Sequence, residues 1–116
     1  MKNYLKNIKD RREKLMKTLR KTLMDEAIRL ANLLKSEKFE FKRIYLFGSL
    51  VKDKPLAPWT DIDLAVEKLP SSAFYKMYSF LIKNSKFSID LKPYEELDKA
   101  LKEKIMKEGK IIYEKR

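Results

Sequence analysis

Two aspartates spaced two residues apart, which open the second of two predicted strands, constrain this chain more than any other feature. The apolar run from Ile44 to Phe47 stops at Gly48-Ser49, an irregular segment follows, and Asp61-Ile62-Asp63 opens a second apolar run. This order predicts strand, turn and strand. Because residues two apart in a strand point the same way, Asp61 and Asp63 share one face, while Ile62 lies on the other.

The same stretch indicates a ligand that carries phosphate and a metal ion. Two neighbouring carboxylates repel each other, and a divalent cation between them relieves that repulsion. Gly48 lets the backbone approach a ligand closely. Ser49 offers a hydroxyl and an N–H at the start of a helical turn, where phosphate is held favourably. We therefore expect phosphates and their metal beside Gly48-Ser49.

The residue types that the sequence lacks narrow the chemistry. It contains no cysteine and no histidine, which excludes disulfides and thiolate metal sites. A general base must then be a carboxylate, a lysine or the substrate itself. A metal must be held by oxygen ligands, which suit magnesium or manganese.

Size and hydropathy predict one domain over residues 1–116, because 116 residues provide for a single hydrophobic core. Residues 1–17 are expected to form a basic helical extension of that domain. No run of about 18 apolar residues is present, and no apolar segment follows the basic residues at the N-terminus. We therefore expect no membrane span, no signal peptide and a cytoplasmic location.

The charge of the chain favours polyanionic partners. Its 28 basic and 17 acidic residues give a net charge of +11, and residues 1–36, with eleven basic and four acidic residues, carry +7 of it. Nucleotides, RNA or an acidic protein surface fit such a charge. A lysine-rich and glutamate-rich surface typical of a hot habitat is the alternative. For residues 1–17 the alternatives are a solvated helical face and a docking arm for a protein or RNA.

The hydrophobic periodicity predicts helices over residues 18–35, from an N-cap at Ser71 or Ser72 to Asn84, and over 95–108, with Gly109 as the C-cap residue. Strands are expected over 39–47, 60–67, 87–91 and 110–113. Asp90 lies in the third of these strands, on the face opposite its apolar neighbours. Trp59 is expected to anchor the loop 52–59 on the core; the alternative is a wall against a nucleotide base.

Gly48-Ser49, then eleven residues, then Asp61-Ile62-Asp63 resembles the signature of the nucleotidyltransferase superfamily that includes DNA polymerase beta. The resemblance is closest to the minimal nucleotidyltransferase (MNT) domains, which are commonly the antitoxin partners of HEPN-domain ribonuclease toxins. It covers roughly residues 27–113. It implies an α/β (α+β) nucleotidyltransferase fold, in which helices flank a small mixed β-sheet.

The resemblance also implies the roles of the site residues. Asp61, Asp63 and Asp90 would be catalytic and would bind two Mg²⁺ ions, with Asp63 bridging them and Asp90 taking the acceptor proton. Gly48, Ser49 and Lys52 would bind the phosphates of ATP. Family members usually carry an arginine and then a glycine shortly after the Gly-Ser, where this chain has Lys52 and Asp53, and the spacing to Asp61 is one residue longer. Lysine keeps the charge but lacks the fork that arginine offers a phosphate.

The resulting hypothesis is an antitoxin that transfers AMP from ATP, with Mg²⁺, to a tyrosine hydroxyl of a HEPN ribonuclease. An enzyme acting on a small molecule such as an aminoglycoside is one alternative. A catalytically silent module that binds the toxin through its basic N-terminal helix is another. A homodimer through the helix over residues 18–35 and an RNA contact through the basic extension are compatible with the sequence. The acceptor, the base and the number of AMP units stay open.

Overall fold

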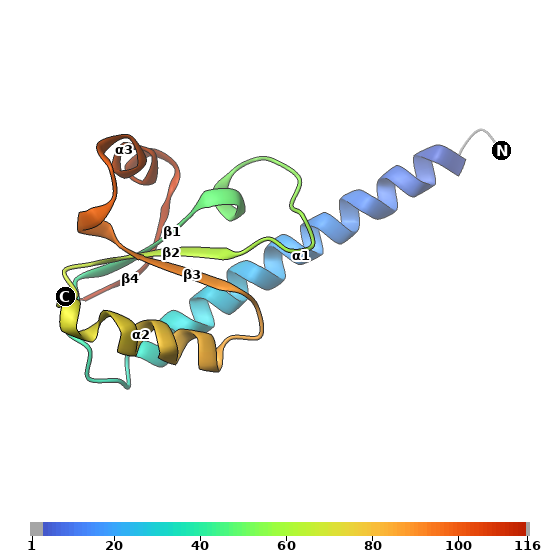
Figure 1. Ribbon diagram of the computed structural model, residues 1–116. Helices are drawn as coiled ribbons and strands as arrows, with labels where there is room; N and C mark the ends of the chain where they lie inside the picture. The colour runs from blue at the N-terminus through green and yellow to red at the C-terminus, as the bar shows by residue number, and fades with distance from the viewer. Residues whose placement is uncertain (1–3, 116) are drawn as a thin grey trace.

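The computed structural model describes residues 4–115, and a four-stranded mixed sheet forms its centre (Figure 1). The strands are β1 (Arg43–Phe47), β2 (Ile62–Glu67), β3 (Ile89–Pro93) and β4 (Lys110–Glu114), in the order β3-β2-β1-β4. Strand β1 pairs antiparallel with β2 and β4, whereas β2 and β3 run parallel. The predicted α+β class with a small mixed sheet flanked by helices is confirmed.

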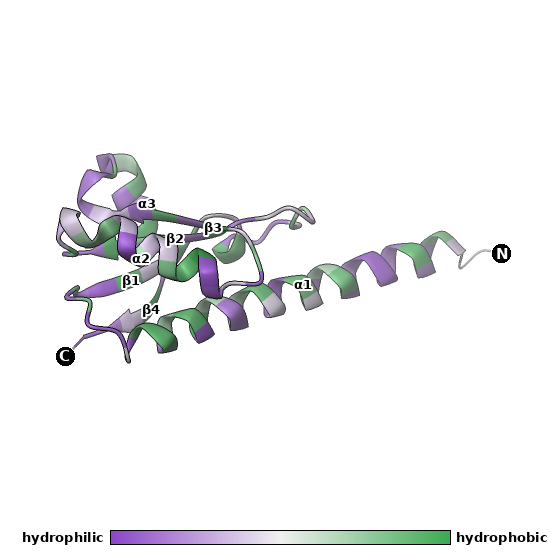
Figure 2. Cartoon of the chain, turned by 60° about the horizontal axis from the view of Figure 1, so that its bottom comes forward, coloured by the Kyte–Doolittle hydropathy of each residue, from purple (hydrophilic) through white to green (hydrophobic). Residues whose placement is uncertain are grey.

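Helix α1 (Tyr4–Leu34) is longer than the predicted helix over 18–35, because the basic extension continues it without a break. The part of the predicted extension before Tyr4 lies outside the described residues. Side chains of the second half of α1, among them Leu23, Leu30 and Leu34, are buried in the core. The first half projects away from the sheet, and Figure 2 shows it from a second side. This projection gives the molecule its extents of 60 × 30 × 23 Å.

Helices α1 and α2 (Ser71–Asn84) cover one face of the sheet. Met77 and Leu81 of α2 are fully buried against Ile44 and Leu64 of the strands. The expected N-cap at Ser71 or Ser72 is wrong. The N-cap is Pro70, which has no capping side chain, and the helix begins directly after the turn that proline imposes.

Helix α3 (Lys99–Glu108) covers the opposite face. Ile105 packs there against Tyr45, Phe47 and Ala65 of the sheet in a second, smaller core cluster. The helix predicted over 95–108 is divided into a short 3-10 turn, η2 (Tyr94–Glu96), and α3. The division occurs because the Asp98 side chain accepts a hydrogen bond from the backbone N–H of Leu101 at 2.8 Å and so caps a new helix. Gly109 is the C-cap residue, as predicted.

The strand predicted over 39–47 begins only at Arg43. Its aromatic residues serve packing instead: the Phe41 ring lies 4.9 Å from that of Tyr113, and the Phe39 ring lies 6.4 Å from that of Phe80. The strand expected over 60–67 likewise begins at Ile62, which leaves Asp61 just before it. Strand β3 starts and ends two residues later than predicted.

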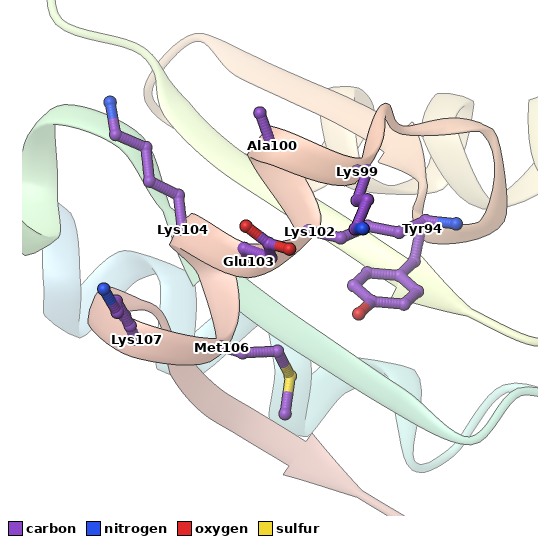
Figure 3. A pocket seen from close by; sticks show the side chains of 8 residues that line it. All are labelled: Tyr94, Lys99, Ala100, Lys102, Glu103, Lys104, Met106 and Lys107. Atoms are coloured by element: carbon purple, nitrogen blue, oxygen red, sulfur yellow. The ribbon is translucent and has the colours of Figure 1, made fainter.

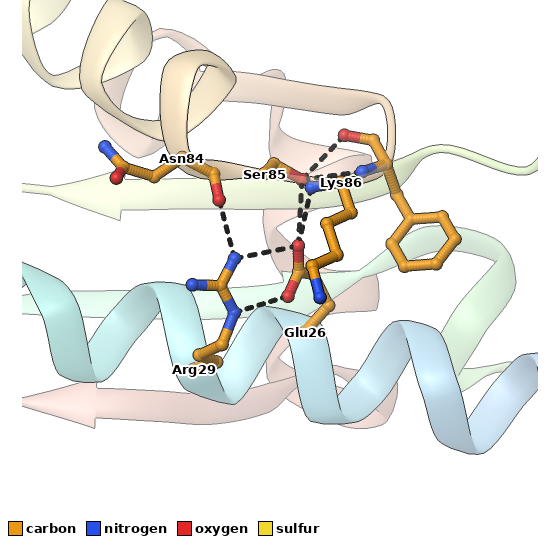
Figure 4. A network of polar contacts seen from close by, with 6 residues as sticks. Glu26, Arg29, Asn84, Ser85 and Lys86 are labelled. Carbon is orange, nitrogen blue, oxygen red and sulfur yellow. Dashed lines mark hydrogen bonds and ion pairs between the residues drawn. The ribbon is translucent and has the colours of Figure 1, made fainter.

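A polar network holds α1 to the junction between α2 and β3 (Figure 4). Glu26, 6% exposed, is the one buried charged residue of residues 4–115. Its carboxylate accepts hydrogen bonds from Arg29 Nε at 2.6 Å and from the backbone N–H of Lys86 at 2.7 Å. Arg29 Nη2 in turn donates to the carbonyl of Asn84 at 2.6 Å. The hydrogen bond with Arg29 lowers the pKa of Glu26 to about 2, against the opposing effect of burial. This network fixes where the chain enters β3.

None of the helices within residues 4–115 has the length and the apolar character that crossing a membrane requires.

Candidate active site

Asp63 and Asp90 lie side by side on the sheet face that carries α3. They are register partners in the parallel strands β2 and β3, so their side chains emerge from neighbouring positions of the same face. On its other side Asp63 is in register with Phe47 of β1. Asp61 is exposed and directly precedes β2. The prediction that Asp90 lies opposite the apolar residues of its strand is confirmed, since Ile89 and Leu91 are buried in the core between the sheet and the first two helices.

The surroundings of Asp63 disfavour the charged form of its carboxylate. Burial raises the pKa of Asp63 to about 6, and repulsion from Asp90 and Asp61 acts in the same direction. Lys92 and Lys52 act in the opposite direction without cancelling the effect. A carboxylate in such surroundings is stabilised in its charged form by a nearby cation.

Gly48 approaches this carboxylate too closely for any side chain. It begins the 3-10 turn η1 (Gly48–Val51) with φ +77°, in the left-handed region that favours glycine. A Cβ at this position would lie 2.1 Å from Oδ2 of Asp63. The predicted strand, Gly-Ser turn and second strand therefore bring the turn directly against Asp63.

A pocket of about 300 Å³ opens between this turn, β2 and α3. It is lined by all three residues predicted to bind the nucleotide, Gly48, Ser49 and Lys52, and by Asp63. Asp61 and Asp90 do not line it. Lys104 and Glu108 of α3 complete its wall.

Asp90 is engaged by a lysine that sequence analysis did not single out. Lys92 Nζ donates to Asp90 Oδ2 at 2.8 Å, and this hydrogen bond raises the pKa of Lys92. The alternation of β3 could have revealed Lys92, because it lies two residues beyond Asp90 and must share its face. Lys104 and Glu108 gave no comparable signal, because only the packing of α3 on the sheet brings them to the pocket.

The predicted cluster of three carboxylates is not formed by the side chains as they stand. Within residues 4–115, no three His, Cys, Asp or Glu side chains are grouped so that they could hold a metal ion. The physical reason is that Asp90 is paired with Lys92, while Asp61 lies outside the strand and is exposed. Asp63 and Asp90 are adjacent, and Asp61 is near enough to act on the pKa of Asp63.

Trp59 does not anchor its loop. Its side chain is 81% exposed, and the buried residue of the loop is Leu56. The prediction of a packed tryptophan is wrong because leucine at position 56 already fills the contact with the core.

A larger depression of about 630 Å³ lies along α3 and Tyr94 (Figure 3). Lysines line much of it, and Lys102 lies with Nζ 5.5 Å from the centre of the Tyr94 ring. The depression contains none of the predicted site residues.

Solved structures with a similar fold include several that are described as toxin–antitoxin structures. One is a mutant of the complex MntA-HpeT, with a TM-score of 0.59, 21% identity, and coverage of 76% of this chain and 73% of that chain. Another is a toxin–antitoxin crystal structure with AMP-PNP, with a TM-score of 0.58, 23% identity, and coverage of 79% and 73%. At these identities the likeness concerns the fold. Among curated proteins, none matches this sequence.

The sequence itself matches a family model over most of its length. Residues 28–116 match the model described as "Polymerase beta, Nucleotidyltransferase". The match begins within α1 and includes the Gly48-Ser49 turn, both strand carboxylates and α3. The chain therefore belongs to the polymerase beta family of nucleotidyltransferases.

Proposed function

We propose that this protein transfers AMP from ATP to a hydroxyl group of a HEPN-type toxin, most specifically a tyrosine, and acts as its antitoxin. The observation that carries the proposal is the adjacent pair Asp63 and Asp90 on one face of the sheet, of which Asp63 lies against the Gly48-Ser49 turn. Paired carboxylates beside a phosphate-binding turn are what phosphoryl chemistry with a divalent cation requires.

The donor set suits Mg²⁺. Asp61, Asp63 and Asp90 offer only carboxylate oxygens, the hard ligands that Mg²⁺ prefers. The burial and repulsion that raise the pKa of Asp63 are the costs that a bound cation would offset. Although Asp90 is paired with Lys92 in this structure, Asp61, Asp63 and Asp90 are the residues that would hold the proposed two ions. When bound, the ions would neutralise charge on the triphosphate and lower the pKa of the acceptor hydroxyl.

The pocket side chains bind and orient the nucleotide. Gly48 lets the turn approach the phosphates, Ser49 donates to them, and Lys52 neutralises charge on the pyrophosphate as it leaves. The acceptor oxygen attacks the α-phosphorus in line. The bond between the α-phosphorus and the oxygen that bridges it to the β-phosphate breaks, and pyrophosphate departs. Asp90 accepts the proton of the acceptor hydroxyl at a carboxylate oxygen. Lys92, at 2.8 Å, keeps that carboxylate oriented.

Two observations beyond the pocket residues support a protein as the acceptor. The similar folds are described as toxin–antitoxin complexes, and one of those crystals contains AMP-PNP, an ATP analogue. Within residues 4–115, Asp61 beside the site is exposed, so the site is open to a partner at this point. A partner that brings its own hydroxyl to the site fits this geometry.

The projecting half of α1 favours a second candidate, a module that masks the toxin by contact alone. Residues 4–17 carry six basic and two acidic side chains. Most residues of this stretch are exposed, and so are its leucines Leu5, at 77%, and Leu15, at 69%. A basic helix with exposed leucines suits an acidic protein surface. Such contact could serve docking for the transferase or constitute the whole function.

One experiment separates the two candidates. The protein is mixed with a HEPN protein encoded beside it, Mg²⁺ and α-labelled ATP, and both label on the partner and complex formation are measured. The transferase requires label that is lost in Asp63→Asn, with the complex retained. The contact module requires no label and a complex that is lost when residues 1–14 are deleted but not in Asp63→Asn. Absence of both label and complex would point to a small-molecule acceptor.

A further inference from the structure

Arg20 of α1 reaches across to the segment that follows β1. Its Nη1 donates to the carbonyls of Ser49, at 3.2 Å, and Leu50, at 2.5 Å. Its Nη2 donates to the carbonyl of Lys54. One guanidinium thus holds three backbone carbonyls of a segment that is about thirty residues away in the sequence.

These carbonyls flank Lys52 on both sides. Leu50 precedes it by two residues and Lys54 follows it by two, so the fork of Arg20 fixes the backbone at both ends of a short span. Within that span the N–H of Lys52 donates to the carbonyl of Ser49 at 3.3 Å. Between η1 and the buried Leu56, the chain from Lys52 to Pro55 has no helix or strand of its own. Arg20 is therefore a principal restraint on it.

The same hydrogen bonds limit the ability of Arg20 to bind a phosphate directly. Arginine can bind a phosphate through the two nitrogens of its fork, but both terminal nitrogens of Arg20 already donate to carbonyls. With three of its five N–H groups used in this way, Arg20 has no free terminal fork of the kind that the arginine of family members near position 52 offers a phosphate. It acts on the site through the backbone.

We propose that Arg20 is a positioning residue of the nucleotide site, which holds Ser49 and Lys52 at the pocket that contains Asp63. The inference rests on the proposed function, because the positioned groups matter only if the pocket binds the triphosphate of ATP. Without Arg20 the segment samples other conformations. Only a fraction of the molecules then presents Lys52 to the phosphates, and the apparent affinity for ATP falls by that fraction.

The test compares Arg20→Met and Arg20→Lys with the matched control Lys17→Met, which removes a cation from the same helix at an exposed position. The readouts are the KM for ATP and kcat of transfer to the HEPN protein, and amide hydrogen exchange of residues 49–54. We expect Arg20→Met to raise the KM for ATP about tenfold. A change of that size corresponds to the loss of one or two charge-assisted hydrogen bonds. Exchange of residues 49–54 should quicken. Arg20→Lys should recover only part of the affinity, because lysine lacks the fork.

A merely structural role gives a different result. A less stable protein has fewer folded molecules, which lowers the apparent kcat and leaves KM unchanged. An unchanged KM in Arg20→Met, or equal effects in Arg20→Met and Lys17→Met, would overturn the inference. If the wild-type protein binds no ATP, the proposed function fails, and faster exchange in Arg20→Met would then reduce Arg20 to a structural residue of the segment.

Discussion

Removing the charge of Glu26 should destabilise the protein by an amount that depends on pH. In the folded state the pKa of Glu26 lies at about 2, against 4.5 for the free side chain. A shift of that size corresponds to about 3 kcal/mol. Arg29, the main partner, is 43% exposed, so that solvent screens part of the attraction. We therefore expect about 2 kcal/mol for Glu26→Gln at pH 7.

The sign of the pH dependence follows from the direction of the shift. Because folding lowers the pKa of Glu26, its stabilisation is fully present above pH 4.5 and is lost as the pH falls towards 2. Denaturant unfolding of the wild type and of Glu26→Gln should therefore give curves that differ by about 2 kcal/mol at pH 7 and converge near pH 2. Glu26→Ala should cost about 1 kcal/mol more, because it also leaves the N–H of Lys86 without its acceptor.

Asp25→Asn is the matched control. Asp25 is the neighbouring residue and also pairs with a cation, Lys21 at 2.8 Å, but both side chains are exposed. Such a pair contributes little to stability, because solvent screens the attraction between two exposed charges. If Glu26→Gln costs no more than this control at pH 7, or if its cost is the same at pH 7 and pH 2, the reasoning about the network is refuted.

Three further changes test the rest of the structure. Gly48→Ala should abolish transfer and cost about 1–2 kcal/mol, because of its positive φ and the contact with Asp63; normal activity in a transfer assay would disprove this close approach. Asp63→Asn should abolish transfer yet leave the metal-free protein as stable or more stable in thermal melts, since repulsion is relieved; a clear drop in Tm would mark Asp63 as a structural partner of a lysine. Trp59→Ala should change the unfolding free energy by less than about 0.5 kcal/mol, because the side chain is exposed; a larger loss measured in denaturant would mean that it packs on the core after all.

The parts of the fold that follow from local pattern could be predicted. The leucines of α1, the buried face of α2 and the alternation around Asp63 and Asp90 each read directly as an element with a known face. Element ends were less predictable, because a single polar contact decides them: Asp98 caps α3 and divides a helix whose apolar spacing continues through 95–108.

Only the part of the site that is formed by residues close together in the sequence could be predicted. Gly48, Ser49 and Asp63 meet because one turn and one strand pair bring them together. Lys104 and Arg20 reach the same region through the packing of α3 and α1, which no local pattern encodes. The exposure of Trp59 was not predicted. The loop needs only one residue packed on the core, and the sequence does not indicate that Leu56 and not Trp59 is that residue.

The fate of two labels on ATP tests the central claim most directly. The protein and a candidate HEPN partner are incubated with Mg²⁺ and ATP that carries one label on the α-phosphate and another on the γ-phosphate. The account predicts the α label on the partner and the γ label in free pyrophosphate, with both signals lost in the double variant Asp61→Asn/Asp63→Asn. Transfer of the γ label to the partner, or release of pyrophosphate that persists in the double variant, would contradict it.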